Sequence, residues 1–250
     1  LLLSHGTGGK LDPAGIEALV ARRSDIHYPK PRVVSLTLPT EVGTLYSLDE
    51  LRDIRETARR LGLSIHLDGA RFFNAVAASG KPAGDIIHAL GPDVVCLGGT
   101  KAGMSLGEAV VFFNRPLAAE FAYRCKQAGQ LASKMRFLSA QWCGLLSADA
   151  WRRHAGNANE RASQLRKAIE TLQGLCFPYP TEANSVFVCA DKQVLDALRA
   201  RGWKFYEFIG GAARFMCSWD TTAEDVEALA LDFAAAAGVP ARGDGRGGGP

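Results

Sequence analysis

The chain has 250 residues, of which 47% are hydrophobic and 22% are charged, and its formal net charge is +3. This composition is typical of a globular protein with a substantial buried core, and no apolar run reaches the length of a membrane-spanning helix. The basic residues are scattered rather than gathered with aromatics on one face, so the sequence predicts neither a nucleic-acid partner nor a membrane partner.

The first elements in chain order are a short apolar segment and a glycine-rich loop, HGTGGK at 5–10. The loop does not have the spacing of a P-loop, and no Ser or Thr follows its lysine, so we interpret it as a connection. Asp12 and Pro13 then fit the N-cap and first position of a helix. Residues 33–38 predict a strand, and the loop 39–44 follows its carboxyl end.

A capping box of Ser47 and Glu50 predicts the start of an amphipathic helix that runs to about Leu61. Strands are then predicted at 64–67 and 93–97, with one short helical segment between them.

The carboxyl ends of these two strands carry the most reactive residues. The first strand ends in Asp68, and the second continues into Gly98-Gly99-Thr100-Lys101. Because open α/β sheets place their ligands at the carboxyl ends of the strands, we expect this carboxylate and this amine to lie side by side. A further strand at 108–113 returns from Lys101 like a hairpin and would hold that residue rigidly.

An Asp and a Lys in this arrangement suit a pyridoxal-phosphate enzyme. A desolvated lysine amine can deprotonate and form a Schiff base with the cofactor. A carboxylate beside the ring nitrogen keeps that nitrogen protonated. Thr100 and nearby backbone N–H groups are candidate phosphate donors. Taken singly, Asp68 also fits a turn residue or helix N-cap, and Lys101 a solvated loop residue.

Residues 115–150 predict a long helix that is broken near Gly129. Helices are predicted at 157–172, 192–201 and 222–237, and strands at 183–188, 204–208 and 213–218. Arg214 lies on the last of these strands among apolar neighbours, where an unpaired charge is costly to bury. It therefore faces a site, or it lies at a strand edge in water. The glycine-rich segment 239–250 predicts a disordered tail.

Six cysteines stand singly along the chain and form neither a CxxC pair nor a metal-ligand pattern. We therefore expect no metal site, and we expect reduced, buried thiols in a cytoplasmic protein. They are Cys96, Cys125, Cys143, Cys176, Cys189 and Cys217. His66 alternates with apolar residues in its strand and is interpreted as a packed histidine rather than a catalyst.

HLDGARFFNA at 66–75, GGTKAGM at 98–104 and EAVVFF at 108–113 together resemble the low-specificity threonine aldolases. These enzymes belong to the β-eliminating lyase group of fold-type-I pyridoxal-phosphate enzymes. PTEVGTLYS at 39–47 and YRCKQAGQLASKMRF at 123–137 fit the same family, so the resemblance covers nearly all of the chain.

The resemblance implies an α/β fold with a mostly parallel sheet flanked by helices in a large cofactor-binding domain, residues 1–125. A smaller C-terminal α/β domain with its connecting helices would follow at 126–238, and the tail at 239–250. The family has a further N-terminal segment with a phosphate-binding turn and a ring-stacking aromatic residue. Neither is found here, so the large domain is expected to be incomplete at its N-terminus.

The resemblance also implies roles for single residues. Lys101 and Asp68 would be catalytic and would bind the cofactor, and Arg71 and Arg214 would bind the substrate carboxylate by their bidentate forks. By its residue type alone, Arg71 could equally be a surface arginine of a helix. Further cofactor contacts would come from Thr100 and Thr40, and from Arg136 and Lys126 across the interface of a homodimer or homotetramer.

The implied reaction is cleavage of a β-hydroxy-α-amino acid, threonine or allo-threonine, into glycine and acetaldehyde. The cofactor would be pyridoxal 5'-phosphate. Three alternatives stay open: another pyridoxal-phosphate lyase or an aminotransferase, an inactive truncated remnant, and a small-molecule binding module without covalent chemistry.

Overall fold

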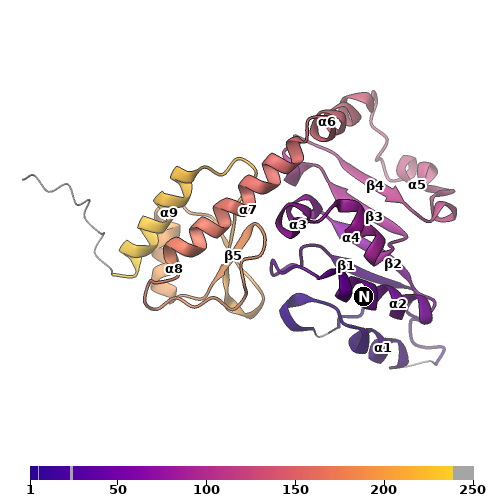
Figure 1. Cartoon of the computed structure of the whole chain (residues 1–250), viewed down its shortest axis with the longest axis horizontal. Helices are drawn as coiled ribbons and strands as arrows, with labels where there is room; N and C mark the ends of the chain where they lie inside the picture. The colour runs from indigo at the N-terminus through magenta and orange to yellow at the C-terminus, as the bar shows by residue number, and fades with distance from the viewer. Residues whose placement is uncertain (5, 23–24, 239–250) are drawn as a thin grey trace, which may run out of the picture.

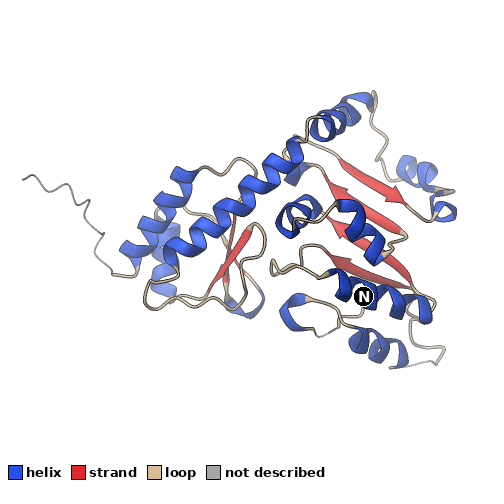
Figure 2. Ribbon diagram, viewed as in Figure 1, coloured by secondary structure: helices blue, strands red, loops and turns tan. Residues whose placement is uncertain are grey.

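The structure is a computed structural model that describes residues 1–4, 6–22 and 25–238. The tail predicted at 239–250 lies outside the described residues. Figures 1 and 2 show two α/β units, with the long helix α7 (Ala150–Ile169) running from the first to the second.

The first unit contains a four-stranded sheet in the order β1-β2-β3-β4. The strands β1 (Val33–Thr37), β2 (Ser64–Gly69) and β3 (Val94–Gly98) are parallel, and β4 (Glu108–Phe112) is antiparallel to β3. All four predicted strands are present, and the hairpin-like return after Lys101 is confirmed. The register aligns the carboxyl ends of β1, β2 and β3 at one edge of the sheet, where the predicted site residues lie.

The described helices around this sheet include α1 (Pro13–Ala21), α2 (Leu48–Arg60), α3 (Phe72–Ser79) and α4 (Ala83–Leu90). They share one core with the alternate, inward-facing residues of the strands, such as Leu67 and Val95, which meet Ile54 of α2 and Leu90 of α4. Alternation along the strands selects one face of the sheet for burial.

Local side chains begin the helices as predicted. Asp12 accepts a hydrogen bond from the Gly15 amide at 2.7 Å, and Ser47 and Glu50 form the reciprocal capping box of α2.

The prediction of one short helical segment between β2 and β3 was wrong, because the segment is split into α3 and α4. Gly80 ends α3 in a left-handed conformation with φ of 64°, and Pro82 then precedes α4. A left-handed glycine after the last helical residue satisfies free carbonyls and turns the chain. Two helices therefore cover a length of chain for which the pattern predicted one.

The second unit has a three-stranded antiparallel sheet in the order β5-β7-β6. Its strands are β5 (Ser185–Val188), β6 (Tyr206–Glu207) and β7 (Ala213–Met216), and the helices α7, α8 (Lys192–Ala200) and α9 (Ala223–Ala236) pack against them. The fully buried ring of Phe233 on α9 meets Phe215 of β7 with centroids 5.1 Å apart, so an aromatic contact joins helix and sheet.

The segment 115–150 differs from the predicted long helix. It forms a short 3-10 helix, Arg115–Ala118, then α5 (Phe121–Gln127) and α6 (Arg136–Ser147). The break near Gly129 is confirmed, but it extends to Lys134, which has a positive φ of 57°. Asp149, with φ of 50°, separates α6 from α7. Helix α7 therefore begins at Ala150 instead of the predicted residue 157.

All six cysteines lie within the described residues and are free thiols. Cys217 is buried, whereas Cys143 and Cys176 are exposed and the other three are half-buried, which corrects the prediction that all six are buried. Among the helices that the structure describes, none combines the length and the apolar character that a membrane crossing requires.

Candidate active site

The carboxyl ends of β2 and β3 touch because glycine occupies both of them. A Cβ atom on Gly98 would lie 2.6 Å from the carbonyl oxygen of Ala70 and 2.9 Å from its Cα. A Cβ atom on Gly69 would lie 2.7 Å from the carbonyl oxygen of Cys96. These neighbours are backbone atoms, so only glycine permits the approach. The turn that follows Asp68 is thereby held against the strand that leads to Lys101.

Asp68 lies half-buried at the end of β2. Its carboxylate accepts a hydrogen bond from the Ala70 amide at 2.9 Å, so it serves as a turn residue as well as a charged group of the site. Its charge acts on both Lys101 and Arg71, which places the three side chains in one cluster.

Lys101 is carried by a 3-10 turn, Thr100–Ala102, directly after β3. Partial burial lowers the pKa of Lys101, and the positive charge of Arg71 lowers it further, whereas the carboxylates of Asp68 and Glu108 raise it. A lowered pKa increases the fraction of neutral amine, which is the nucleophilic form. The position of Lys101 thus suits covalent chemistry with a carbonyl group.

Two guanidinium groups complete the cluster. Burial lowers the pKa of Arg71, and the like charge of Arg214 lowers it further, while Asp68 and Glu41 raise it. Arg214 lies on β7 of the second unit, and its guanidinium covers the ring of Phe208 with 4.6 Å to the centroid. Within the described residues, neither guanidinium forms an ion pair or a side-chain hydrogen bond. Two guanidinium groups without such partners are suited to bind a carboxylate or a phosphate.

Glu108 belongs to this cluster, although the sequence did not single it out. Partial burial raises the pKa of Glu108, Lys101 lowers it, Asp68 raises it, and a hydrogen bond with Thr100 lowers it. Glu108 is the first residue of β4 and pairs with Gly98. The predicted hairpin could therefore have placed Glu108 near Lys101. The predicted contact of Thr100 with a cofactor phosphate stays a prediction.

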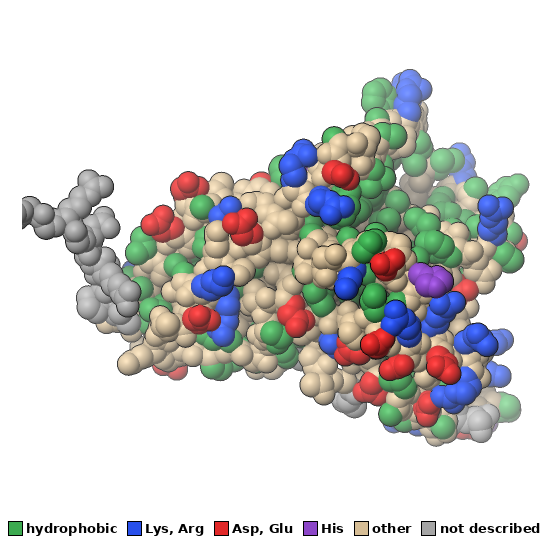
Figure 3. Space-filling model, viewed as in Figure 1, with side chains coloured by type: hydrophobic (Ala, Val, Ile, Leu, Met, Phe, Trp, Pro, Cys, Tyr) green, Lys and Arg blue, Asp and Glu red, His purple; other side chains and the backbone are tan. Residues whose placement is uncertain are grey.

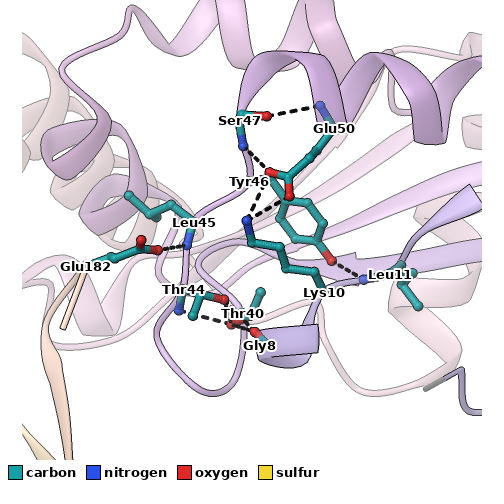
Figure 4. Close-up of polar contacts among 10 residues, drawn as sticks. All are labelled: Gly8, Lys10, Leu11, Thr40, Thr44, Leu45, Tyr46, Ser47, Glu50 and Glu182. Atoms are coloured by element: carbon teal, nitrogen blue, oxygen red, sulfur yellow. Dashed lines mark hydrogen bonds and ion pairs between the residues drawn. The ribbon is translucent and has the colours of Figure 1, made fainter. Parts of the chain in front are cut away.

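Thr40 lies in the loop after β1, which Figure 4 shows in detail. Its buried hydroxyl is 2.7 Å from the Thr44 hydroxyl, and Thr44 donates to the carbonyl oxygen of Gly8 at 2.6 Å. From the second unit, the Glu182 carboxylate accepts a hydrogen bond from the Leu45 amide at 2.6 Å. Thr40 therefore stabilises the loop that carries Glu41, and its predicted role in cofactor binding stays a prediction.

Lys126 on α5 and Arg136 at the start of α6 are exposed and are not among the charges that act on Lys101. The structure does not bring them to the cluster within this chain. They border an apolar surface around β4, α5 and α6, part of which is visible in Figure 3. A groove of about 710 Å³ lies in this surface. Exposed apolar residues that line this groove include Leu106, Val110 and Met135.

His66 bridges neighbouring strands, as expected for a packed strand histidine. Its Nδ1 lies 2.9 Å from the Ser35 hydroxyl on β1, and its Nε2 lies 3.4 Å from the Cys96 sulfur on β3. Both ring nitrogens are thus used within the sheet.

Comparison with known proteins gives consistent matches over most of the chain. Residues 2–193 match the family described as beta-eliminating lyase. The low specificity L-threonine aldolase of Pseudomonas aeruginosa is 55% identical over 93% of this chain and 68% of that protein. The enzyme of the same name from a Pseudomonas species is 54% identical over 94% and 68% of the two chains. A threonine aldolase structure from Leishmania major has a TM-score of 0.84 and 26% identity, covering 92% and 68% of the two chains.

Proposed function

Because the chain belongs to the beta-eliminating lyase family, we propose that it is a pyridoxal-phosphate-dependent aldehyde-lyase. Its reaction is the cleavage of threonine or allo-threonine into glycine and acetaldehyde, as the names of its Pseudomonas relatives suggest. The observation that carries the proposal is the meeting of Lys101, Asp68, Arg71 and Arg214 in one charged cluster.

The residues of the cluster fit pyridoxal 5'-phosphate. Lys101, whose pKa is lowered, would form the covalent link to the cofactor aldehyde, and Asp68 would partner the pyridinium nitrogen. When bound, the cofactor supplies an electron sink for the electron pair released at the substrate Cα. Contacts to its phosphate would come from Thr100 and Thr40, and from Arg136 and Lys126 of another subunit.

The substrate is held through its carboxylate. Arg71 and Arg214 come from different units of the chain, and the positive charge of Arg214 lowers the pKa of Arg71, which supports a site that the two guanidiniums share. Two arginine forks fix both the position and the orientation of a carboxylate. This orientation determines which bond at Cα is aligned for cleavage, so the arginines direct the reaction to the Cα–Cβ bond. Nζ of Lys101 would be able to release and take up a proton near Cα.

A homodimer or homotetramer is part of the proposal. A second copy that covers the apolar surface around β4, α5 and α6 would bury its exposed residues. Lys126 and Arg136 border this surface and would then reach a site in the partner. We also place the protein in the cytoplasm, where six free thiols are stable.

The proposal is tested on the purified chain mixed with pyridoxal phosphate, by borohydride reduction, peptide mass analysis and an acetaldehyde assay with threonine. The cofactor mass should appear on Lys101, and acetaldehyde should form. Lys101→Ala should abolish both signals, whereas Lys81→Ala, in the exposed turn between α3 and α4, should leave them unchanged. Release of pyruvate and ammonia would instead identify a different lyase, and the absence of cofactor on Lys101 would contradict the enzyme function.

A further inference from the structure

His154 connects the turn that carries Lys101 to helix α7. Its side chain is half-buried, and its Nδ1 lies 2.7 Å from the carbonyl oxygen of Ala102. Because a carbonyl oxygen can only accept, Nδ1 must carry the proton in this contact. Ala102 follows Lys101 directly, so the hydrogen bond holds the peptide unit between Ala102 and Gly103, one residue beyond the reactive lysine.

The backbone of the turn is matched to the histidine ring. Gly103 has φ of 107°, and a Cβ atom on it would lie 2.4 Å from Nδ1 of His154. Both the positive φ and the short distance require glycine at this position. The amides of Gly103 and Met104 donate in turn to the carbonyls of Thr100 and Gly99, at 3.2 and 3.1 Å. The histidine ring therefore packs against a turn whose backbone hydrogen bonds join residues on either side of Lys101.

The other side of the ring is fixed by the second unit. Trp219 packs against His154 with ring centroids 5.1 Å apart and ring planes tilted by 41°. One turn further along α7, Asn157 donates to the carbonyl oxygens of Trp219 and Thr221, at 3.1 and 2.9 Å. Trp219 lies shortly after β7, the strand that carries Arg214. Helix α7 thus connects the lysine turn to the segment that follows the arginine strand.

We propose that His154 is a positioning residue for Lys101. The Nδ1–H group fixes the 3-10 turn through Ala102, and Trp219 fixes the ring, so that the amine of Lys101 is held at a defined place relative to Arg214. The effect of His154 on the rate of threonine cleavage rests on the proposed function. The effect of His154 on the geometry of the turn does not.

Two variants separate the hydrogen bond from the aromatic ring. His154→Phe keeps a ring to stack on Trp219 and removes the donor. His154→Asn places a side-chain N–H at the position of Nδ1 and removes the ring. Loss of the donor should lower kcat for threonine cleavage about 10- to 100-fold, with a much smaller change in KM, because small displacements of a reacting group are costly. The asparagine variant should recover most of the lost kcat.

A second readout does not depend on activity. Hydrogen exchange at the amides of Ala102, Gly103 and Met104 should become faster in His154→Phe and return toward the wild-type rate in His154→Asn. Exchange in β5 and β7 should stay unchanged in both variants.

Equal behaviour of the two variants would overturn the proposal, and so would a loss of thermal stability without faster exchange in the turn. If the wild-type chain fails to cleave threonine, the proposed function is wrong, and the exchange rates alone still decide the role of His154.

Discussion

The contact between the two strand ends predicts that Gly98→Ala damages the active site more than the fold. The added Cβ atom would lie 2.6 Å from the carbonyl oxygen of Ala70, whereas ordinary contacts begin at 3.4 Å. The end of β3 must therefore move away from the turn after Asp68 by about 0.8 Å (3.4 minus 2.6). Overpacking of this kind costs about 1–3 kcal/mol of stability. A displacement near 1 Å at a reacting group costs about 100-fold in rate.

The assay is a pair of measurements on each variant, urea unfolding and kcat for threonine cleavage. Gly84→Ala is the matched control, because Gly84 lies in α4 with no atom within 4 Å of an added Cβ. This control should keep wild-type kcat and should not lose stability, because alanine has a better helix propensity than glycine. If Gly98→Ala keeps wild-type kcat and stability, the close approach of the strand ends does not determine the position of Lys101.

Three further changes test the electrostatics and the core. Arg71→Gln should raise the pKa of Lys101, since only burial lowers that pKa more than Arg71 does. Modification of Lys101 by an amine reagent, followed by mass spectrometry, should then require a higher pH. Burial raises the pKa of Tyr46 from 10.0 to about 12, so the unfolded state loses this proton first. Stability should fall between pH 10 and 12 by about 2 kcal/mol more in the wild type than in Tyr46→Phe, as measured by urea unfolding. Phe233→Ala, in the fully buried core of the second unit, should lower the free energy of unfolding by about 3–5 kcal/mol. The exposed Leu231→Ala on the same helix should lower it by less than about 0.5 kcal/mol in the same urea measurement.

The sequence predicted best those features that depend on neighbouring residues. The caps at Asp12 and Ser47 are local contacts between a side chain and the next turn of backbone, so a short stretch of sequence contains all the information they need. The boundary between α6 and α7 is different. Asp149 adopts a positive φ there although it is not a glycine. The neighbouring sequence did not predict this turn. Tertiary packing of α7 across the two units determines where that helix begins.

The site divides in the same way. Asp68 and Lys101 directly follow apolar strands, so their place at the sheet edge could be predicted from the topology of parallel sheets. Glu108 required one more step, because its neighbours follow only from the register of β4 on β3. His154 and Trp219 could not be found in this way, since each meets the lysine turn through the packing of a distant helix or loop.

The charges of the cluster explain why lysine and arginine are not interchangeable within it. Burial and like charge lower the pKa of both Lys101 and Arg71, but a guanidinium keeps its proton at physiological pH, whereas an ammonium can lose it. Of these cations, Lys101 is thus the one whose protonation depends on the neighbouring charges. A substrate carboxylate bound to Arg71 and Arg214 would offset their charge, and the pKa of Lys101 would then rise.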